Sequence, residues 1–137
     1  MAQFVGRYQH HKNENIDDYF TAVGVPYIGR KMLAASSPVM EITYDNEFMT
    51  IKYVSLLRTV ESTFKFGVEY DEYMPGKTIK SVTTLINDSE FETKSLIPDN
   101  GVKSSRHFIF SENDEVIVVH SHSKGTVPGK RYFRKIK

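Results

Sequence analysis

Two histidines near the end of the chain have the spacing of paired ligands on one strand. His120 and His122 are two residues apart in an alternating segment, so both side chains should face the same side of a β-strand. A zinc site needs a third protein ligand, and none is evident, because His10 and His11 would face opposite sides. We therefore predict neither a metal nor another cofactor, and we interpret His120 and His122 as polar side chains that point inward.

The motifs of common enzymes do not occur in the sequence. There is no glycine-rich phosphate loop, no nucleophile elbow and no HExxH zinc motif. Two pairs of acidic residues have the chemistry of general acids and bases. However, Asp17-Asp18 fits the first turn of a helix, and Asp71-Glu72 fits the end of a strand. The sequence thus predicts a binding protein and not an enzyme.

Length and composition limit the class of protein. The 137 residues predict one domain that spans residues 1–137. The 18 basic and 17 acidic residues give a net charge of +1, which argues against a surface built for nucleic acid. Cysteine is absent from the sequence, which excludes disulfides and thiolate metal sites. Because the sequence shows neither an apolar run of transmembrane length nor a signal peptide, we expect a cytoplasmic protein.

Residues 15–36 have the pattern of two short helices. Asn13 or Asn15 can cap the first helix, and Gly24 suits its end. Its single apolar stripe is formed by Ile16, Tyr19, Phe20 and Val23. Pro26 suits the start of the second helix, whose apolar side is predicted to be Ile28, Met32 and Leu33. Helices this short need another surface to cover.

Most of the remaining chain alternates with a period of two, which is typical of β-strands. A first strand is expected from Gly6 to His11, and short strands separated by turn residues follow from Val39 to the end. The later strands are expected at residues 79–86, 91–97, 102–110, 116–122 and 130–136. A series of about ten such strands predicts an antiparallel meander that forms a sandwich or a barrel.

Two segments of the chain carry a family motif. The first comprises Gly6, Tyr8, Asn15, Asp17, Asp18, Tyr19, Gly24 and Val25, with Ile16 where an aromatic residue is usual. The second is residues 62–72, STFKFGVEYDE. In these residues the chain resembles the intracellular lipid-binding proteins, the family of fatty-acid-binding and retinoid-binding proteins. The resemblance extends over nearly the whole chain and is loosest at residues 86–110.

This resemblance implies an all-β fold, a ten-stranded antiparallel up-and-down barrel of the calycin or lipocalin type with a two-helix lid at about residues 15–36. A barrel of ten strands is too wide for its own side chains to fill, so it can hold a hydrophobic ligand. The implied function is non-enzymatic transport of a long-chain fatty acid or a similar hydrophobic molecule. A retinoid or another hydrophobic small molecule remains an alternative ligand.

The family binds a ligand's head group through Arg-x-Tyr on the last strand. A carboxylate cannot be buried without a partner, so a cationic donor is needed there. In this chain two registers compete. Either Arg131 and Phe133 point inward, which keeps the arginine, or Lys130 and Tyr132 do, which keeps the tyrosine. We favour Arg131 with Phe133, and a solvated basic strand end is the alternative.

The family also has an inward arginine on the third strand from the end. Here Phe108 occupies its expected place, and Arg106 lies two residues earlier on the same face. We predict that both line the ligand site, although a slip by one residue would turn His107 and Ile109 inward instead. Tyr19 is a further ligand-binding candidate on the first helix, where it either lines the portal or packs the lid. Leu57 stands where many members have a portal phenylalanine.

The expected partners follow from the same interpretation. The ligand is a fatty acid or another small hydrophobic molecule, and the protein is expected to be a monomer that does not bind nucleic acid. Lys12, Arg30 and Lys31 could touch an anionic membrane when ligand is delivered, although a solvated charged face also explains them. Two other classes stay open at this point, a nucleic-acid-binding barrel that uses the basic last strand and a barrel with a filled interior.

Overall fold

The computed structural model describes residues 1–56, 58–74, 77–98, 101–125 and 127–136. Leu57, Pro75-Gly76 and Asp99-Asn100 lie outside the described residues. After a short 3-10 turn at Ala2–Phe4, the elements are β1 (Gly6–Glu14), α1 (Ile16–Ala22), α2 (Tyr27–Ala35), β2 (Val39–Asp45), β3 (Phe48–Val54), β4 (Thr59–Phe64), β5 (Tyr70–Met74), β6 (Lys77–Asn87), β7 (Glu90–Leu96), β8 (Lys103–Phe110), β9 (Glu115–His122) and β10 (Gly129–Ile136).

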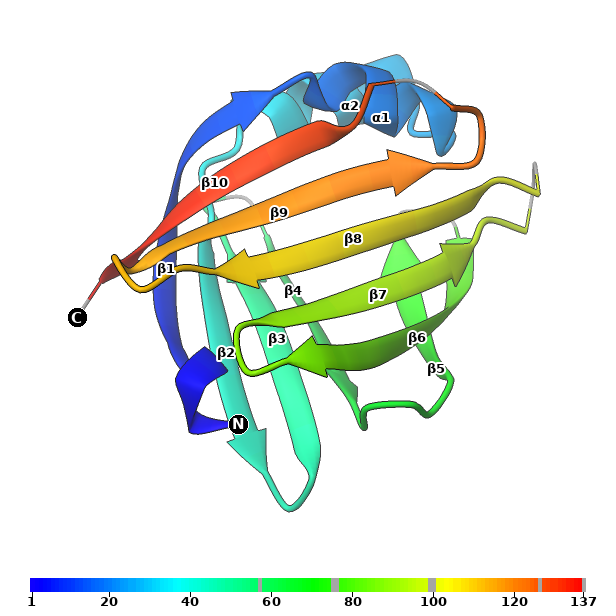
Figure 1. Ribbon diagram of the computed structural model, residues 1–137. Helices are drawn as coiled ribbons and strands as arrows, with labels where there is room; N and C mark the ends of the chain where they lie inside the picture. The colour runs from blue at the N-terminus through cyan, green and yellow to red at the C-terminus, as the bar shows by residue number, and fades with distance from the viewer. Residues whose placement is uncertain (57, 75–76, 99–100, 126, 137) are drawn as a thin grey trace.

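The strands form one antiparallel sheet that curls into a barrel (Figure 1). The order in this 10-stranded sheet is β4-β3-β2-β1-β10-β9-β8-β7-β6-β5. Pairing of β1 with β10 joins the beginning of the chain to its end. The two outer strands, β4 and β5, are not hydrogen-bonded neighbours in the described part of the chain. The predicted up-and-down barrel of ten strands with two helices is confirmed.

The first strand is longer than its sequence pattern predicts. β1 continues past His11 to Glu14, which pairs with Lys130. The register shifts between His10 and Lys12, so a bulge interrupts the strict alternation that would mark a strand in the sequence. This extension brings Asn13 opposite Arg131 on β10.

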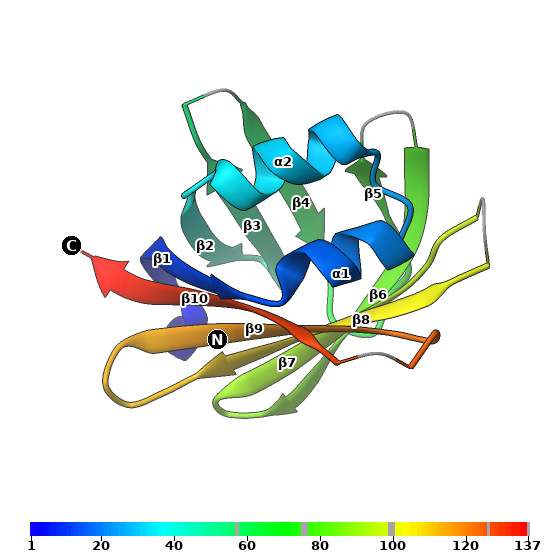
Figure 2. The same cartoon turned by 90° about the horizontal axis from the view of Figure 1, so that it is seen from above.

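Two helices lie across one end of the barrel (Figure 2). Ile16, Tyr19 and Val23 of α1 are buried, as the helical spacing predicts. Asn15 precedes α1 in the left-handed conformation, with φ of 52°, and its side chain donates a hydrogen bond to the carbonyl of Val127 at 3.0 Å instead of capping the helix. Neither described helix is both long enough and apolar enough to cross a lipid bilayer.

The apolar side predicted for α2 is largely wrong. Ile28 is 73% exposed and Met32 is 50% exposed, while Leu33 packs against the buried residues beneath the lid. The reason is that α1 lies on β9 and β10, whereas α2 lies beside α1 and covers little of the barrel wall. An amphipathic pattern in α2 therefore points partly to solvent.

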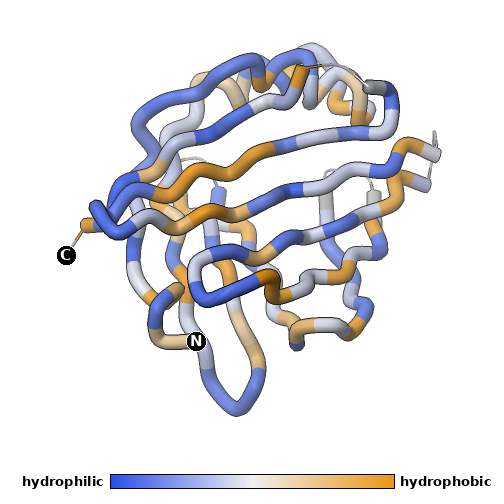
Figure 3. The backbone as a smooth tube through the Cα atoms, viewed as in Figure 1, coloured by the Kyte–Doolittle hydropathy of each residue, from blue (hydrophilic) through white to orange (hydrophobic). Residues whose placement is uncertain are grey.

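An aromatic core surrounds the N-terminal turn. Phe4 meets Phe91 with ring centroids 5.1 Å apart, and Phe91 stacks on Phe108 at 4.6 Å. The other buried members of this core are Tyr8, Met40, Ile42, Met49, Ile51, Phe64, Val116, Val118 and Phe133. These residues come from alternating positions, and Figure 3 shows the corresponding mixture of apolar and polar residues along the strands.

The interior changes character toward the helices. Buried hydroxyl groups face inward from β6, β7 and β8 at Ser81, Thr83, Thr93, Ser95 and Ser104. Neighbouring strands are paired at these positions, so their side chains meet on one face of the sheet. The barrel thus has an apolar region and a polar region, and the side chains of Glu72 and Arg106 contact Ser81 and Ser95 in the polar one.

Candidate ligand-binding site

The last strand turns Arg131 and Phe133 toward the interior. Arg131 is 8% exposed and Phe133 is 1% exposed, whereas Lys130 and Tyr132 are only half-buried. Burial alternates along β10 because successive side chains of a strand face opposite sides. Of the two registers that the sequence allows, the structure therefore has the one with the arginine inside.

Arg131 is held by neutral partners. Its Nε donates to the side-chain oxygen of Asn13 at 3.2 Å, and one terminal nitrogen donates to the carbonyl of Ser36 at 3.4 Å. The guanidinium also lies over the ring of Phe133, 5.8 Å from its centre. Among the described residues, no carboxylate forms a salt bridge with it. Arg131 is therefore a buried cation without a compensating anion.

Burial dominates the electrostatics of Arg131 and of its neighbour Tyr53. Burial lowers the pKa of Arg131, and it raises the pKa of Tyr53 to about 12, although Arg106 and Arg131 act against that rise. Tyr53 therefore keeps its hydroxyl hydrogen at neutral pH and can donate a hydrogen bond. Its ring lies 6.4 Å from that of Phe133. The sequence pattern alone gives Tyr53 no role in the site.

Arg106 also points inward, but its charge is compensated. Its Nη1 donates to Oε2 of Glu72 at 3.0 Å, and its Nη2 contacts Oε1 of the same carboxylate. The two side chains are 21% and 16% exposed. Burial lowers the pKa of Arg106, but the adjacent Glu72 carboxylate outweighs this and raises it overall. Arg106 and Glu72 thus form a nearly neutral unit.

Glu72 is a site residue that sequence reasoning missed. Burial raises the pKa of Glu72, but the charge and hydrogen bonds of Arg106 bring it below its usual value. Ser81 also donates to Oε1 at 2.6 Å. The sequence pattern alone indicates a strand end at Asp71-Glu72 and gives Glu72 no role in the site. Strand alternation could have identified Glu72, because it stands two residues after Tyr70 and therefore shares the inward face of that residue.

A chain of hydroxyl contacts continues from this ion pair along the barrel wall. Ser81 lies 2.6 Å from Ser95, and Thr83 lies 2.7 Å from Thr93. The hydroxyl of Tyr70 is 2.7 Å from that of Thr83. Such cross-strand pairs satisfy buried polar groups that would otherwise be costly. This wall is occupied by its own hydrogen bonds, whereas Arg131 has no anionic partner within the described part of the chain.

Tyr19 and Phe108, the other two predicted site residues, lie in different surroundings. Tyr19 is 6% exposed on the buried side of α1, and its ring centroid is 4.7 Å from that of His120. Phe108 belongs to the aromatic core and is 1% exposed. Phe108 and Arg131 both pair with Val118 across β9, so Phe108 lies in the same row of the barrel as the arginine. Their ligand-binding roles stay predictions.

The histidine pair does not form a metal site in the described structure. No group of three potential ligands of the His, Cys, Asp or Glu type comes together within residues 1–56, 58–74, 77–98, 101–125 and 127–136. His120 is buried near Tyr19 and Phe20, with ring centroids 4.7 Å and 6.4 Å away. His122 lies near the end of β9, where its Nδ1 accepts a hydrogen bond from the backbone nitrogen of Lys124 at 3.2 Å.

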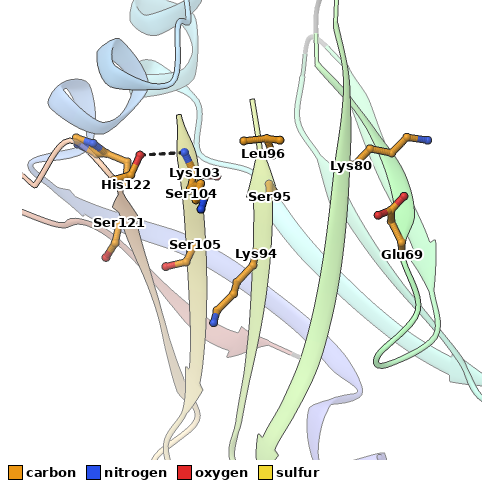
Figure 4. Close-up of a pocket in the computed structure, with 11 residues that line it drawn as sticks. Glu69, Lys80, Lys94, Ser95, Leu96, Lys103, Ser104, Ser105, Ser121 and His122 are labelled. Atoms are coloured by element: carbon orange, nitrogen blue, oxygen red, sulfur yellow. Dashed lines mark hydrogen bonds between the residues drawn. The ribbon is translucent and has the colours of Figure 1, made fainter. Parts of the chain in front are cut away.

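A pocket of about 700 Å³ opens at the ends of β6 to β9 (Figure 4). Its lining includes the inward-facing Ser95 and Ser104, and the outward-facing Lys94 and Ser105, so it extends around the strand ends. Arg131 and Phe133 are not among its lining residues. The pocket is thus separate from the charge at β10.

Comparison with known proteins agrees with this architecture. The sequence model of the lipocalin / cytosolic fatty-acid binding protein family matches residues 5–93. Fatty acid-binding protein type 3 of Fasciola hepatica is 34% identical over 101 residues, which are 73% of this chain and 76% of that protein. Fatty acid-binding protein homolog 6 of Caenorhabditis elegans is 31% identical over 134 residues, covering 97% of this chain and 98% of that protein.

A solved structure shows the same fold. The Schistosoma mansoni fatty acid binding protein in complex with arachidonic acid aligns with a TM-score of 0.90 at 22% identity, covering 100% of this chain and 98% of that one. At this level of identity the likeness concerns the arrangement of the elements.

Proposed function

The chain belongs to the lipocalin / cytosolic fatty-acid binding protein family, and from this premise we propose that it carries a long-chain fatty acid whose carboxylate is bound by Arg131. Members of this family bind and transport lipids and are not enzymes. The observation that supports the finer proposal is the buried guanidinium of Arg131, which has no carboxylate partner among the described residues.

The acyl chain would supply most of the affinity. Each buried methylene contributes about 0.8 kcal/mol, so a chain of about sixteen carbons contributes on the order of 12 kcal/mol before losses. Loss of translational freedom and ordering of the chain remove a large part of this. Aromatic and aliphatic side chains such as Phe108 and Phe133 offer the apolar contacts.

The carboxylate would contribute selectivity. A charge-assisted hydrogen bond is worth about 1.5 to 3 kcal/mol net, and an unpaired buried charge costs more than that. Arg131 can offer this bond because its present partners, Asn13 and the carbonyl of Ser36, are neutral. Phe133 has no hydroxyl group, and the neutral hydroxyl of Tyr53 is available on β3. Arg106 is less suited, since Glu72 already neutralises it.

A matched pair of substitutions tests the role of Arg131. Arg131→Gln removes the buried charge, and Lys130→Gln removes the half-exposed charge beside it. We expect the first to weaken binding of the fluorescent fatty acid cis-parinaric acid about 10- to 100-fold, and the second to leave it unchanged. Fluorescence titration measures both. Loss of binding in Lys130→Gln alone would refute the assignment of Arg131.

The exposed side of α2 supports a brief contact with anionic membranes during delivery. Tyr27, Ile28 and Met32 expose apolar surface there, and the ammonium group of Lys31 lies 5.3 Å from the centre of the Tyr27 ring. Lys12 lies away from α2, on β1, and forms a salt bridge with Glu14. Substitution of Ile28 and Met32 by serine should slow transfer of parinaric acid to phosphatidylserine vesicles and leave its binding constant unchanged. Equal transfer rates would exclude this contact.

The remaining parts of the proposal concern the state of the protein in the cell. We expect a monomer that acts in the cytoplasm, as the description of a cytosolic binding family suggests. Native mass spectrometry of the purified protein tests both the monomer and the ligand, because a retained lipid appears as a mass increment on the protein. A retinoid in place of a fatty acid would identify the alternative ligand class.

A further inference from the structure

His120 is a buried polar residue. It belongs neither to the aromatic core nor to the row of buried hydroxyl groups on β6, β7 and β8. Its ring is buried, with a residue exposure of 7%, and both ring nitrogens are shielded from solvent. Neither nitrogen has a hydrogen-bond partner among the described residues. An unsatisfied polar group in the interior costs about 1 to 3 kcal/mol. The two ring nitrogens of His120 can therefore form hydrogen bonds with a molecule that enters the interior.

The neighbours of His120 indicate which ligand atom can bind there. On β8 it is opposite Arg106, and on β10 it is opposite Gly129, two residues before Arg131. Because residues two apart on a strand share a face, Arg131 is the diagonal neighbour of His120. Gly129 has no side chain that could stand between them. His120 and Arg131 are therefore diagonal neighbours on the inner face of the sheet, and no side chain at residue 129 separates them.

We propose that His120 is a second head-group ligand beside Arg131, and that it donates a ring N–H to the anionic oxygen of the bound lipid. This inference rests on the proposed function, because it assumes that an anion binds at Arg131. In this arrangement the imidazole offers the neutral donor that Phe133, without a hydroxyl group, does not offer at the same site.

The electrostatics of the site fit a neutral donor. Burial first, and then the positive charges of Arg106 and Arg131, hold the pKa of His120 well below its usual value. The ring is therefore neutral near pH 7, with one N–H donor and one acceptor nitrogen. The titratable groups around it are Tyr19 on α1, Arg106 on β8 and Arg131 on β10. None of these is an anion at neutral pH, so a bound carboxylate would be the nearest negative charge apart from Glu72, which Arg106 holds.

Two probes separate a head-group contact from a general effect on the cavity. cis-Parinaric acid has a carboxylate, whereas diphenylhexatriene is a hydrocarbon without a head group. We expect His120→Leu to weaken binding of parinaric acid about 5- to 10-fold and to change binding of diphenylhexatriene less than about 2-fold. His120→Asn keeps an amide donor and should restore part of the loss. His122→Leu, on the same face of β9, is the matched control.

The outcomes are distinguishable from those of the proposed function. If Arg131→Gln weakens parinaric acid and His120→Leu does not, the role of His120 is refuted and the fatty-acid site stands. If Arg131→Gln has no effect, the fatty-acid site itself fails. Equal weakening of both probes by His120→Leu would also refute the head-group contact. The ¹⁵N resonances of the His120 ring in the unmodified protein give a reading free of folding defects, since they should shift on adding parinaric acid and not on adding diphenylhexatriene.

Discussion

Arg106 and Glu72 form an ion pair across the inside of the barrel. They belong to β8 and β5, which the sheet separates by β7 and β6. The Nη1–Oε2 distance is 3.0 Å, and Ser81 donates to the same carboxylate at 2.6 Å. The pair therefore connects the outer strand β5 to the interior of the sheet. Among the described strands β5 pairs only with β6. We therefore expect the ion pair to stabilise the position of β5 at the open side of the barrel.

Breaking this pair should cost stability because it leaves one charge buried alone. We expect Glu72→Gln and Arg106→Gln each to lower the free energy of unfolding by about 3 kcal/mol. The double substitution leaves no unpaired charge, so its cost should be smaller than the sum of the two single costs. Urea unfolding monitored by circular dichroism measures all four proteins. Additive costs would show that the two side chains do not interact in solution.

Restoring a tyrosine at residue 133 should strengthen binding of the head group. Phe133 is 1% exposed and its ring lies next to the guanidinium of Arg131. In Phe133→Tyr the added hydroxyl is buried, which should lower the stability of the free protein by about 1 kcal/mol. The same hydroxyl should donate to the carboxylate of the ligand and tighten binding of parinaric acid about 3- to 10-fold. Tyr53→Phe, which removes a hydroxyl on β3, should have the opposite effect.

The direction of this change is checked by comparison with the hydrocarbon probe. Diphenylhexatriene cannot accept the new hydrogen bond, so its affinity for Phe133→Tyr should not rise. A parallel rise for both probes would mean that the substitution enlarges or reshapes the cavity, and it would contradict the head-group explanation.

Two buried histidines make stability depend on pH in the weakly acidic range. Burial lowers the pKa of both His10 and His120. In the unfolded chain each ring has a pKa of about 6.5, so the unfolded state takes up protons first as the pH falls. The stability is therefore fully present above about pH 6.5 and is lost below it, by up to about 1.4 kcal/mol per pH unit for each histidine.

Removing one of these histidines should flatten that dependence. We expect the free energy of unfolding of His120→Leu to fall less steeply between about pH 6.5 and 5 than that of the unmodified protein. Loss of the Glu72 interaction adds a second decrease at lower pH, because the pKa of Glu72 is held below its usual value and its stabilisation is lost as the pH falls through that lowered pKa. Equal slopes for His120→Leu and the unmodified protein would contradict the buried neutral imidazole.

Much of the fold followed from local patterns in the sequence. Alternation of period two indicated the strands, and the spacing of Ile16, Tyr19 and Val23 indicated the buried side of α1. The prediction for α2 was wrong because an apolar stripe does not show whether a helix lies on a sheet or beside another helix. Ile28 and Met32 illustrate this, since their spacing is helical and both are exposed.

The site was less accessible to sequence reasoning because its contacts join distant strands. Alternation left two registers open for the last strand, and the family motif favoured the one with Arg131 inside. The pairing of Arg106 with Glu72 spans 34 residues and two intervening strands, and no local pattern reports such a contact. The isolation of His120 likewise depends on which side chains fail to reach it. Periodicity predicts the face of a residue, whereas its partners depend on the curvature of the whole barrel.

The start of α1 lies very close to β10 at Gly129. A Cβ atom at residue 129 would lie 3.0 Å from the backbone oxygen of Asn15 and 3.2 Å from the Cα of Ile16. Because these are backbone atoms, α1 would have to move away from the strand. We expect Gly129→Ala to lower the free energy of unfolding by about 1 to 3 kcal/mol. It should also speed release of parinaric acid in stopped-flow displacement, since Ile16 and Tyr19 of α1 pack on the buried residues at this end of the barrel. Lys130→Ala changes the adjacent half-exposed residue and should alter neither quantity. If Gly129→Ala destabilises the protein and release keeps its rate, α1 does not control the path of the ligand.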